Sequence, residues 1–369
     1  MEKGSEAQPA RMDAIDIPAG WEPALGAPLV EGRCMLVIGP TSAGKSTFCL
    51  LAANRALEAG RRPAVLDTDS GQSNVGPPTT LGAARVGKPL ASWQEATPQE
   101  LYFLGASSPV GHLLEAATGT LVLARRMRQA GADLLIVNTT GLVEGGLARA
   151  LKGAKVALLE PSHIVSIAKG EETDGILAEA VGRKDIEVMK LKPSKRAKER
   201  NAQARRERRE RQFEEYFQAA KERGLNLSEI AIWGAPLKRG ERLDGTARRF
   251  VEGVLGSKVI WGEKTARGAF LVVDESPESE EARELKDSFG GETIIIARAK
   301  LEGLLAGLYD AAGKDIALGR VEEIDFAKGK IRIAAALSDT AEVAALKFGF
   351  LRIAPDGKEL ESLPATFWG

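Results

Sequence analysis

Cysteine, net charge and long apolar runs are all scarce in this chain of 369 residues. The two cysteines, Cys34 and Cys49, exclude a disulfide framework, and their apolar surroundings predict buried thiols. No apolar run reaches the length of a membrane span, and the polar stretch 1–20 lacks a signal-peptide core. The 51 basic residues balance the 51 acidic ones, so the total charge indicates no partner. We therefore expect a cytoplasmic protein that has no membrane partner.

One glycine-rich stretch organises the rest of the chain. The sequence GPTSAGKST, residues 39–47, follows a short apolar run at 35–38 and precedes a helical pattern at 48–59. This order of strand, loop and helix is that of the phosphate-binding P-loop, and every defined position of G-x-x-x-x-G-K-[ST] is filled. The alternative is a glycine turn beside an ordinary surface lysine, which would need a chance match in the right context.

The residue types of this loop suit a bound phosphate. Gly39 and Gly44 let the backbone approach an anion that a Cβ would block. The loop amides and the dipole of the following helix then face that anion. In this motif Lys45 reaches the β- and γ-phosphates of a nucleotide, and the Ser46 hydroxyl ligates Mg²⁺.

Apolar runs alternate with helical patterns over the first half of the chain. A helix is expected at about 112–129, and a loop at 70–87, which is rich in Gly, Pro, Ser and Thr. Further candidate strands are 64–66, 102–104, 133–137, 163–167 and 186–191. The alternation predicts an α/β fold with a doubly wound, mainly parallel sheet of the P-loop NTPase type.

Two aspartates follow the second predicted strand. Asp67 and Asp69 lie on the same side of that strand, because side chains alternate with a period of two. Parallel α/β sheets bind ligands at the carboxyl ends of their strands, which places both carboxylates beside the P-loop. The alternative is that they are turn residues at a strand end, a common use of aspartate.

A strongly basic stretch interrupts the α/β pattern at 193–211. Lysines and arginines far outnumber the three glutamates there, and no apolar stripe appears before Phe213. Such a helix has no face to bury, which is typical of a solvated arm or a lid over phosphates. A charged surface helix with internal ion pairs is the alternative.

The motifs limit the classes of P-loop protein to which this chain can belong. A guanine-specific switch would need N-K-x-D, which the turn at 138–141 does not provide. A kinase needs a carboxylate at the acceptor hydroxyl, a surface for the acceptor and cations that cover the phosphates. The aspartates, the loops at 70–80 and 105–112, and the basic stretch can supply these parts.

Four stretches together resemble the Clp/Grc-type polynucleotide 5′-hydroxyl kinases of RNA processing. They are GPTSAGKST at 39–47, GRRPAVLDTDSGQSNVGPPTT at 60–80, GASSPVGH at 105–112 and VNTTG at 137–141. The run D-x-D-x-G-Q followed by G-P-P-T is far more specific than the P-loop alone. The resemblance covers most of residues 31–217 and weakly the remainder. One departure is Leu142, where family members often carry a tryptophan that can stack on a base.

The resemblance implies ATP and Mg²⁺ as cofactors and a nucleic acid with a 5′-hydroxyl end as acceptor. Asp69 aligns with the general base, and Ser46 with Asp67 would hold the metal. The nucleotide would be bound by Gly39, Thr41, Ser42, Ala43, Gly44, Lys45, Ser46 and Thr47. Residues that would contact the acceptor or the transferred phosphate are Gln72, Ser107, Ser108, His112, Thr139 and Thr140. His112 is equally well explained as the first residue of a helix.

The residue patterns, together with the resemblance, set the expected domains. We expect an N-terminal tail or arm at 1–30 and a P-loop kinase domain at 31–240, which includes a basic lid at 192–217. Within this lid we select Arg205 and Arg209 as catalytic cations, because they lie i,i+4 on one helical face. A smaller β-rich C-terminal domain, barrel or sandwich, is expected at 241–369, where β-branched segments are split by turns.

Three functions remain open at this point. The leading hypothesis is an ATP-dependent kinase that phosphorylates the 5′-hydroxyl end of RNA, with DNA as an open extension. The second is a P-loop NTPase that serves as a nucleotide-dependent assembly factor in RNA processing. The third is a kinase of small metabolites, which would act on free nucleosides or sugars and respond little to salt, whereas a polynucleotide kinase loses acceptor affinity as salt rises.

Overall fold

The structure is a computed structural model. It describes residues 16–31, 33–197, 201–266, 268–276, 281, 285, 288–289 and 293–368. Contacts divide the chain into two compact units, Met1–Arg209 and Glu210–Gly369. The first part of the predicted N-terminal tail and two basic lid residues, Lys198 and Arg200, lie outside the described residues. Each unit is described by itself below.

The first unit is built on a seven-stranded sheet with the order β4-β3-β2-β5-β1-β6-β7. Its strands are β1 (Cys34–Ile38), β2 (Pro63–Thr68), β3 (Thr80–Arg85), β4 (Glu100–Phe103), β5 (Leu134–Thr139), β6 (His163–Ile167) and β7 (Glu187–Leu191). Strands β2, β5, β1, β6 and β7 are mutually parallel, whereas β3 pairs antiparallel with both of its neighbours. The parallel strands therefore all end at the same edge, where α/β sheets bind ligands.

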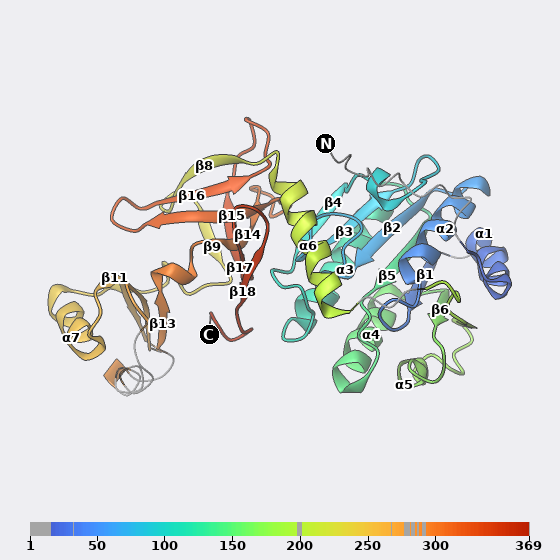
Figure 1. The fold of residues 1–369 in the computed structure, drawn as a ribbon, viewed down its shortest axis with the longest axis horizontal. Coiled ribbons are helices and arrows are strands. Elements are labelled where there is room, and N and C mark those ends of the chain that lie inside the picture. Colours follow the sequence, from blue (N-terminus) through green and yellow to red (C-terminus); the bar gives the residue numbers. More distant parts are fainter. Residues whose placement is uncertain are drawn as a thin grey trace, which may run out of the picture. The chain divides into compact units, whose positions relative to one another are not determined.

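Helices cover both faces of this sheet, which confirms the doubly wound fold (Figure 1). The helices are η2 (Ala19–Leu25), α1 (Ala27–Glu31), α2 (Lys45–Glu58), η3 (Trp93–Glu95), α3 (Leu113–Gln129), α4 (Gly145–Leu159) and α5 (Asp174–Leu177). Alternate residues of each strand feed two cores. Met35 and Val37 pack with η2, α1 and α2, while Leu36 and Ile38 pack with α3, α4 and α5. The basic helix α6 (Ala202–Phe217) begins in this unit.

The second unit contains two sheets that share one core. A seven-stranded sheet has the order β18-β17-β14-β15-β16-β8, with β9 paired to β17, and a four-stranded sheet has the order β10-β11-β12-β13. The strands are β8 (Lys221–Asn226), β9 (Ala231–Trp233), β10 (Glu241–Arg242), β11 (Val259–Thr265), β12 (Gly268–Val273), β13 (Ile294–Ala297), β14 (Leu304–Tyr309), β15 (Asp315–Asp325), β16 (Lys330–Ala335), β17 (Ala345–Ile353) and β18 (Glu359–Ser362). Phe270 and Val272 face the core of the larger sheet, and Leu271 and Val273 face α7 (Gly245–Leu255). The short helix η4 (Arg298–Lys300) follows β13. A separate β-rich unit is thus present, as expected.

Two expectations differ from the structure. The segment 70–87 is not all loop, because β3 forms at 80–85 and pairs antiparallel with β2. The division of the chain falls at Arg209/Glu210 rather than at 240/241, since β8 pairs with β16 and β9 with β17 in the second unit. In the described ranges, no helix combines the length and the apolar character needed to cross a membrane.

Candidate active site

The glycine-rich loop joins β1 to α2 at the carboxyl edge of the first sheet (Figure 1). Gly44 caps α2 with a φ of 97°, a left-handed conformation that favours glycine. A Cβ on Gly39 would overlap the carbonyl oxygen of Ile167, so no larger residue fits there. The Lys45 amine is buried and donates to the carbonyl of Pro40 at 2.8 Å. Burial lowers the pKa of Lys45, and the carboxylate of Asp69 opposes this shift.

Asp67 is buried at the end of β2 and is held by four donors. Its Oδ1 accepts from the Asn138 side-chain amide at 3.0 Å and from the Asp69 backbone at 3.2 Å. Its Oδ2 accepts from both the backbone and the side chain of Asn74. Burial and then the charge of Asp69 raise the pKa of Asp67, while these hydrogen bonds lower it. The network fixes the carboxylate beside the P-loop.

The same two asparagine amides reach the P-loop serine. The Ser46 hydroxyl accepts from Asn74 at 3.1 Å and from Asn138 at 3.3 Å, so Ser46 and Asp67 share both neighbours. The Oδ1 atom of Asn138 is buried without a partner among the described residues. Mg²⁺ prefers oxygen ligands and takes few of them from protein when phosphates and water supply the rest. The described residues hold no cluster of three His, Cys, Asp or Glu, but this hydroxyl and carboxylate fit Mg²⁺ bound together with a nucleotide.

Asp69 differs from Asp67 in having one carboxylate oxygen uncommitted. Its Oδ1 accepts from the backbone amides of Gly71 at 3.2 Å and Gln72 at 3.1 Å, which closes an Asx turn. Its Oδ2 makes no hydrogen bond within the described part of the chain, and the side chain is half-buried. The carboxylate is therefore held in place and still has an oxygen that can accept a proton.

The predicted acceptor residues fall into two groups. Gly71 packs so closely on the Ser107 carbonyl that a Cβ would overlap it, which brings the loops at 70–74 and 105–112 together. Ser108 is exposed, and its hydroxyl accepts from the Val110 amide. By contrast, Gln72 donates to the carbonyls of Gly71 and Arg205, and His112 is buried at the start of α3. Gln72 is thus tied to its own loop and to α6, and the acceptor contacts of Gln72 and His112 stay a prediction.

The turn after β5 lies directly on the P-loop. A Cβ on Gly141 would overlap Thr41, so the backbone of the turn touches the phosphate loop. The Thr139 hydroxyl donates to the Val37 carbonyl and ties β5 to β1. Thr140 instead meets a buried lysine of α4, Lys152, whose amine donates to both the carbonyl and the hydroxyl of Thr140 at 3.0 Å.

The start of the basic helix α6 contacts the loop at 70–74. Arg208 donates to the Asn74 side chain at 2.9 Å and to the Ser73 carbonyl at 3.2 Å. Arg205 contributes its backbone carbonyl to Gln72, and both it and Arg209 are half-buried on this helix. The lid therefore lies against the loop that follows Asp69, with Arg208 as its side-chain link.

Sequence reasoning missed several residues that shape this site. Asn74 and Asn138 lie inside the motifs at 60–80 and 137–141, so their places were visible although their bridging contacts were not. Arg208 is one arginine in a run without an apolar stripe, which gives no signal for the inward face. Sequence reasoning also missed Lys152 and Lys155, which are buried on one side of α4.

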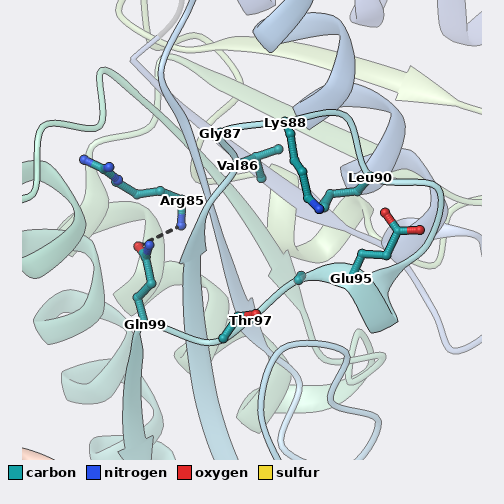
Figure 2. Close-up of a pocket in the computed structure, with 9 residues that line it drawn as sticks. Arg85, Val86, Gly87, Lys88, Leu90, Glu95, Thr97 and Gln99 are labelled. Carbon is teal, nitrogen blue, oxygen red and sulfur yellow. Dashed lines mark hydrogen bonds between the residues drawn. The ribbon is translucent and has the colours of Figure 1, made fainter.

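A separate hollow of about 380 Å³ lies near Arg85, Lys88 and Glu95 (Figure 2). It adjoins the carboxyl end of β3, which runs antiparallel to β2. That end lies at the opposite edge of the sheet from the P-loop. The hollow is therefore not part of the site that contains Lys45, Asp67 and Asp69.

Comparisons with known proteins agree with this geometry. A family model described as mRNA cleavage and polyadenylation factor CLP1 P-loop matches residues 39–219. The polyribonucleotide 5′-hydroxyl-kinase of Thermococcus kodakarensis is 31% identical over 330 residues, which are 88% of this chain and 90% of that protein. The protein of the same name from Pyrococcus abyssi is 29% identical over 329 residues, 88% of this chain and 89% of that one.

More distant relatives share part of the chain or the fold alone. A CLP1 homolog of Anopheles gambiae is 29% identical over 201 residues, which are 52% of this chain and 47% of that protein. A solved complex of Clp1p with Pcf11p matches with a TM-score of 0.56 at 12% identity, and covers 90% of this chain and 76% of that one. From the family model and the archaeal relatives together, the chain belongs to the CLP1 P-loop family, in which the archaeal proteins are named polyribonucleotide 5′-hydroxyl-kinases.

Proposed function

We propose that the protein transfers the γ-phosphoryl group of ATP to the 5′-hydroxyl end of RNA, with Mg²⁺ as the metal. The observation that carries this proposal is the pair of unequal aspartates at the end of β2. Asp67 is fully engaged beside Ser46, whereas Asp69 keeps one oxygen available. This division suits one carboxylate that serves the metal and one that serves the acceptor hydroxyl. The names of the archaeal relatives support the same reaction.

The proposed transfer assigns a role to each group. The acceptor hydroxyl gives its proton to Oδ2 of Asp69 as its oxygen attacks the γ-phosphorus, and ADP leaves on the opposite side. Lys45 and the lid arginines, with Arg205 and Arg209 as first choices, neutralise the phosphoryl oxygens. Ser46 and Asp67 would hold Mg²⁺, which would supply positive charge to the phosphates. The loops at 70–74 and 105–112 would hold the first nucleotides by their backbone, so base preference should be weak.

The decisive experiment follows label from ATP to RNA. Purified protein is incubated with γ-labelled ATP, Mg²⁺ and a 5′-hydroxyl RNA oligonucleotide, in parallel with a DNA oligonucleotide of the same sequence. Asp69→Asn should lower the rate by about 10²-fold or more, the usual contribution of a general base. Asp185→Asn removes an exposed carboxylate of the same unit and should leave the rate unchanged.

Each alternative gives a different result in this assay. Label on RNA that survives in Asp69→Asn would move the base elsewhere and contradict the assignment of Asp69. ATP hydrolysis without any labelled strand would refute the kinase and favour the nucleotide-dependent assembly factor. Label on free nucleosides that is insensitive to salt would favour a metabolite kinase. The cytoplasmic location expected from the sequence stays a prediction.

A further inference from the structure

Two lysines of α4, Lys152 and Lys155, are completely buried although the proposed reaction assigns them no role. They are three residues apart and so lie on the same side of the helix. Neither amine donates to a carboxylate in the described part of the chain. Burial of an ammonium group without an ion pair is costly, and two such groups repel each other. A hydrophobic residue would fill either place at lower cost, so packing alone does not explain them.

Lys152 acts on the turn beside the P-loop. Its amine donates to the carbonyl and to the hydroxyl oxygen of Thr140, at 3.0 Å each. The hydroxyl therefore accepts a hydrogen bond from behind, and its own proton has no acceptor among the described residues. Thr140 directly precedes Gly141, whose backbone rests on Thr41 of the phosphate loop. The uncommitted Thr140 proton is thus one residue away from the contact with that loop.

Lys155 fixes the neighbouring strand end. Its amine donates to the Thr68 hydroxyl at 2.6 Å, and that hydroxyl donates to the Asn138 carbonyl at 2.7 Å. Thr68 stands between the two aspartates of the site, so this chain of bonds ties the end of β2 to the end of β5. Both lysines thus reach strand ends that carry site residues.

The charges of the site reach the same two amines. Burial lowers the pKa of Lys152, Lys155 and Lys45 lower it further, and Asp69 opposes these shifts. Burial likewise lowers the pKa of Lys155, with Asp69 and then Asp67 opposing it. The buried pair is therefore electrostatically coupled to the P-loop lysine and to the aspartates at the end of β2.

We propose that Lys152 is a positioning residue that aims the Thr140 hydroxyl proton at an oxygen of the transferring phosphoryl group, while Lys155 braces the adjacent strand ends. The inference rests on the proposed function and names a further part of the same site. Thr140 would contact the phosphoryl group directly, and Lys152 would act only through Thr140. A donor aimed in advance stabilises charge that develops in the transition state and binds the ground state little.

Kinase assays on a double-mutant cycle test the coupling. Lys152→Met and Thr140→Val should each lower kcat by about 10- to 100-fold, with the KM for ATP changed less than about threefold. The double variant should be no slower than the worse single variant, because both changes remove the same donor. Thr140→Ser keeps the hydroxyl and should retain most of the activity. Arg149→Met removes an exposed charge from the same helix and should behave as wild type.

Thermal unfolding separates positioning from simple structural support. Loss of a buried, unpaired cation should leave the melting temperature of Lys152→Met equal to or above that of wild type while kcat falls. Multiplicative losses in the double variant would overturn the inference. So would a Lys152→Met protein that melts earlier but keeps the wild-type kcat while folded.

A binding measurement tests the inference without any acceptor. The affinity for ADP is measured with Mg²⁺ in the presence and absence of aluminium fluoride, which mimics the phosphoryl group in transfer. Lys152→Met should leave ADP binding alone within about twofold and weaken the fluoride complex by about tenfold or more. If wild type and Lys152→Met bind the fluoride complex with equal affinity, the inference is overturned. If wild type fails to label RNA but shows this difference, the proposed acceptor is wrong and the positioning role stands.

Discussion

The two units bury charge in opposite ways. In the first unit, buried polar groups gather at the carboxyl edge of the parallel sheet and include three lysines and an aspartate: Lys45, Asp67, Lys152 and Lys155. In the second unit, the buried charged groups of the described residues are Glu263, Asp315 and Arg320, and the first and last of these are matched by several partners. Arg320, for example, donates to Glu322 at 2.6 Å and to the Ala354 carbonyl.

The contrast distinguishes buried polar groups that can still bind a ligand from those whose hydrogen bonds are made within the protein. Glu263 shows the second kind clearly, because it accepts from the amides of Lys238, Arg239 and Gly240 and from the Trp261 indole. The carboxylate thus joins β11 to the loop at 238–240, and both of its oxygens are engaged. In the first unit, Asp69, Thr140 and Asn138 each keep a polar atom without a partner in the described residues. Their shared position at one edge of the sheet, rather than the lack of a partner alone, marks the reactive site, because Thr293 Oγ1 of the second unit is also buried without a partner in the described residues.

The largest expected effect comes from removing the positive charge of the P-loop lysine. Lys45→Met should lower kcat by about 10³-fold or more, because the charge that faces the transferred phosphoryl group is lost. Its melting temperature should not fall, since burial already disfavours the charged amine. The matched control is Lys88→Met in the hollow of Figure 2, which should keep wild-type kinetics. Equal losses in both variants would contradict the location of the site.

A second test uses the pH dependence of stability. Burial lowers the pKa of Lys155 from its ordinary value of 10.5 to about 7. Between these values the unfolded chain holds a proton that the folded chain lacks, so the free energy of unfolding should rise as pH increases from about 7 to about 10. Lys155→Met should flatten this rise in denaturant titrations. A profile unchanged by the substitution would show that Lys155 titrates normally.

In the second unit, the strongest expected effect is on stability alone. Glu263→Ala should cost about 2–4 kcal/mol, because three backbone amides and the Trp261 indole lose their acceptor. The kcat measured on folded protein should stay near wild type, which denaturation curves and label-transfer assays can check together. A fall in kcat without a loss of stability would break the proposed contrast between the units.

The smallest expected effects, on the KM for RNA and on stability, come from replacing two arginines. Arg208→Ala should raise the KM for RNA by about tenfold, because the loop at 73–74 loses its link to α6. Arg332→Ala in the second unit removes surface pairs with Glu222 and Glu323 and should change stability by less than about 1 kcal/mol. Parallel kinetics of Arg205→Ala and Arg209→Ala would rank the lid arginines. A larger effect on KM from Arg332 than from Arg208 would contradict the lid contact.

The parts of the site that sequence could predict are those encoded within one short stretch. The P-loop is a contiguous motif in which spacing alone fixes the positions of Gly44, Lys45 and Ser46. The placement of Asp67 and Asp69 followed from strand polarity, which the parallel pairing of β2 with β5 confirms. Both inferences needed only local order and one rule about sheet edges.

The parts that sequence could not predict depend on contacts between distant elements. Strand β3 is rich in small residues and is held by pairing with β2, so its composition indicated a loop. Lys152 and Lys155 look like the solvent side of an amphipathic helix, and only the packing of α4 buries them. The inward-facing arginine of α6 had no apolar stripe to mark it. In each case tertiary packing overrode the local pattern.

The buried thiols give the chain internal probes of its own motion. Cys34 on β1 and Cys49 on α2 flank the P-loop and are fully buried. Burial raises the pKa of Cys34 to about 12 and raises that of Cys49 as well, so neither is a reactive thiolate while the fold is closed. Alkylation of the native protein must then wait for this segment to open. Its rate should report that opening at the phosphate loop, and bound nucleotide should slow it.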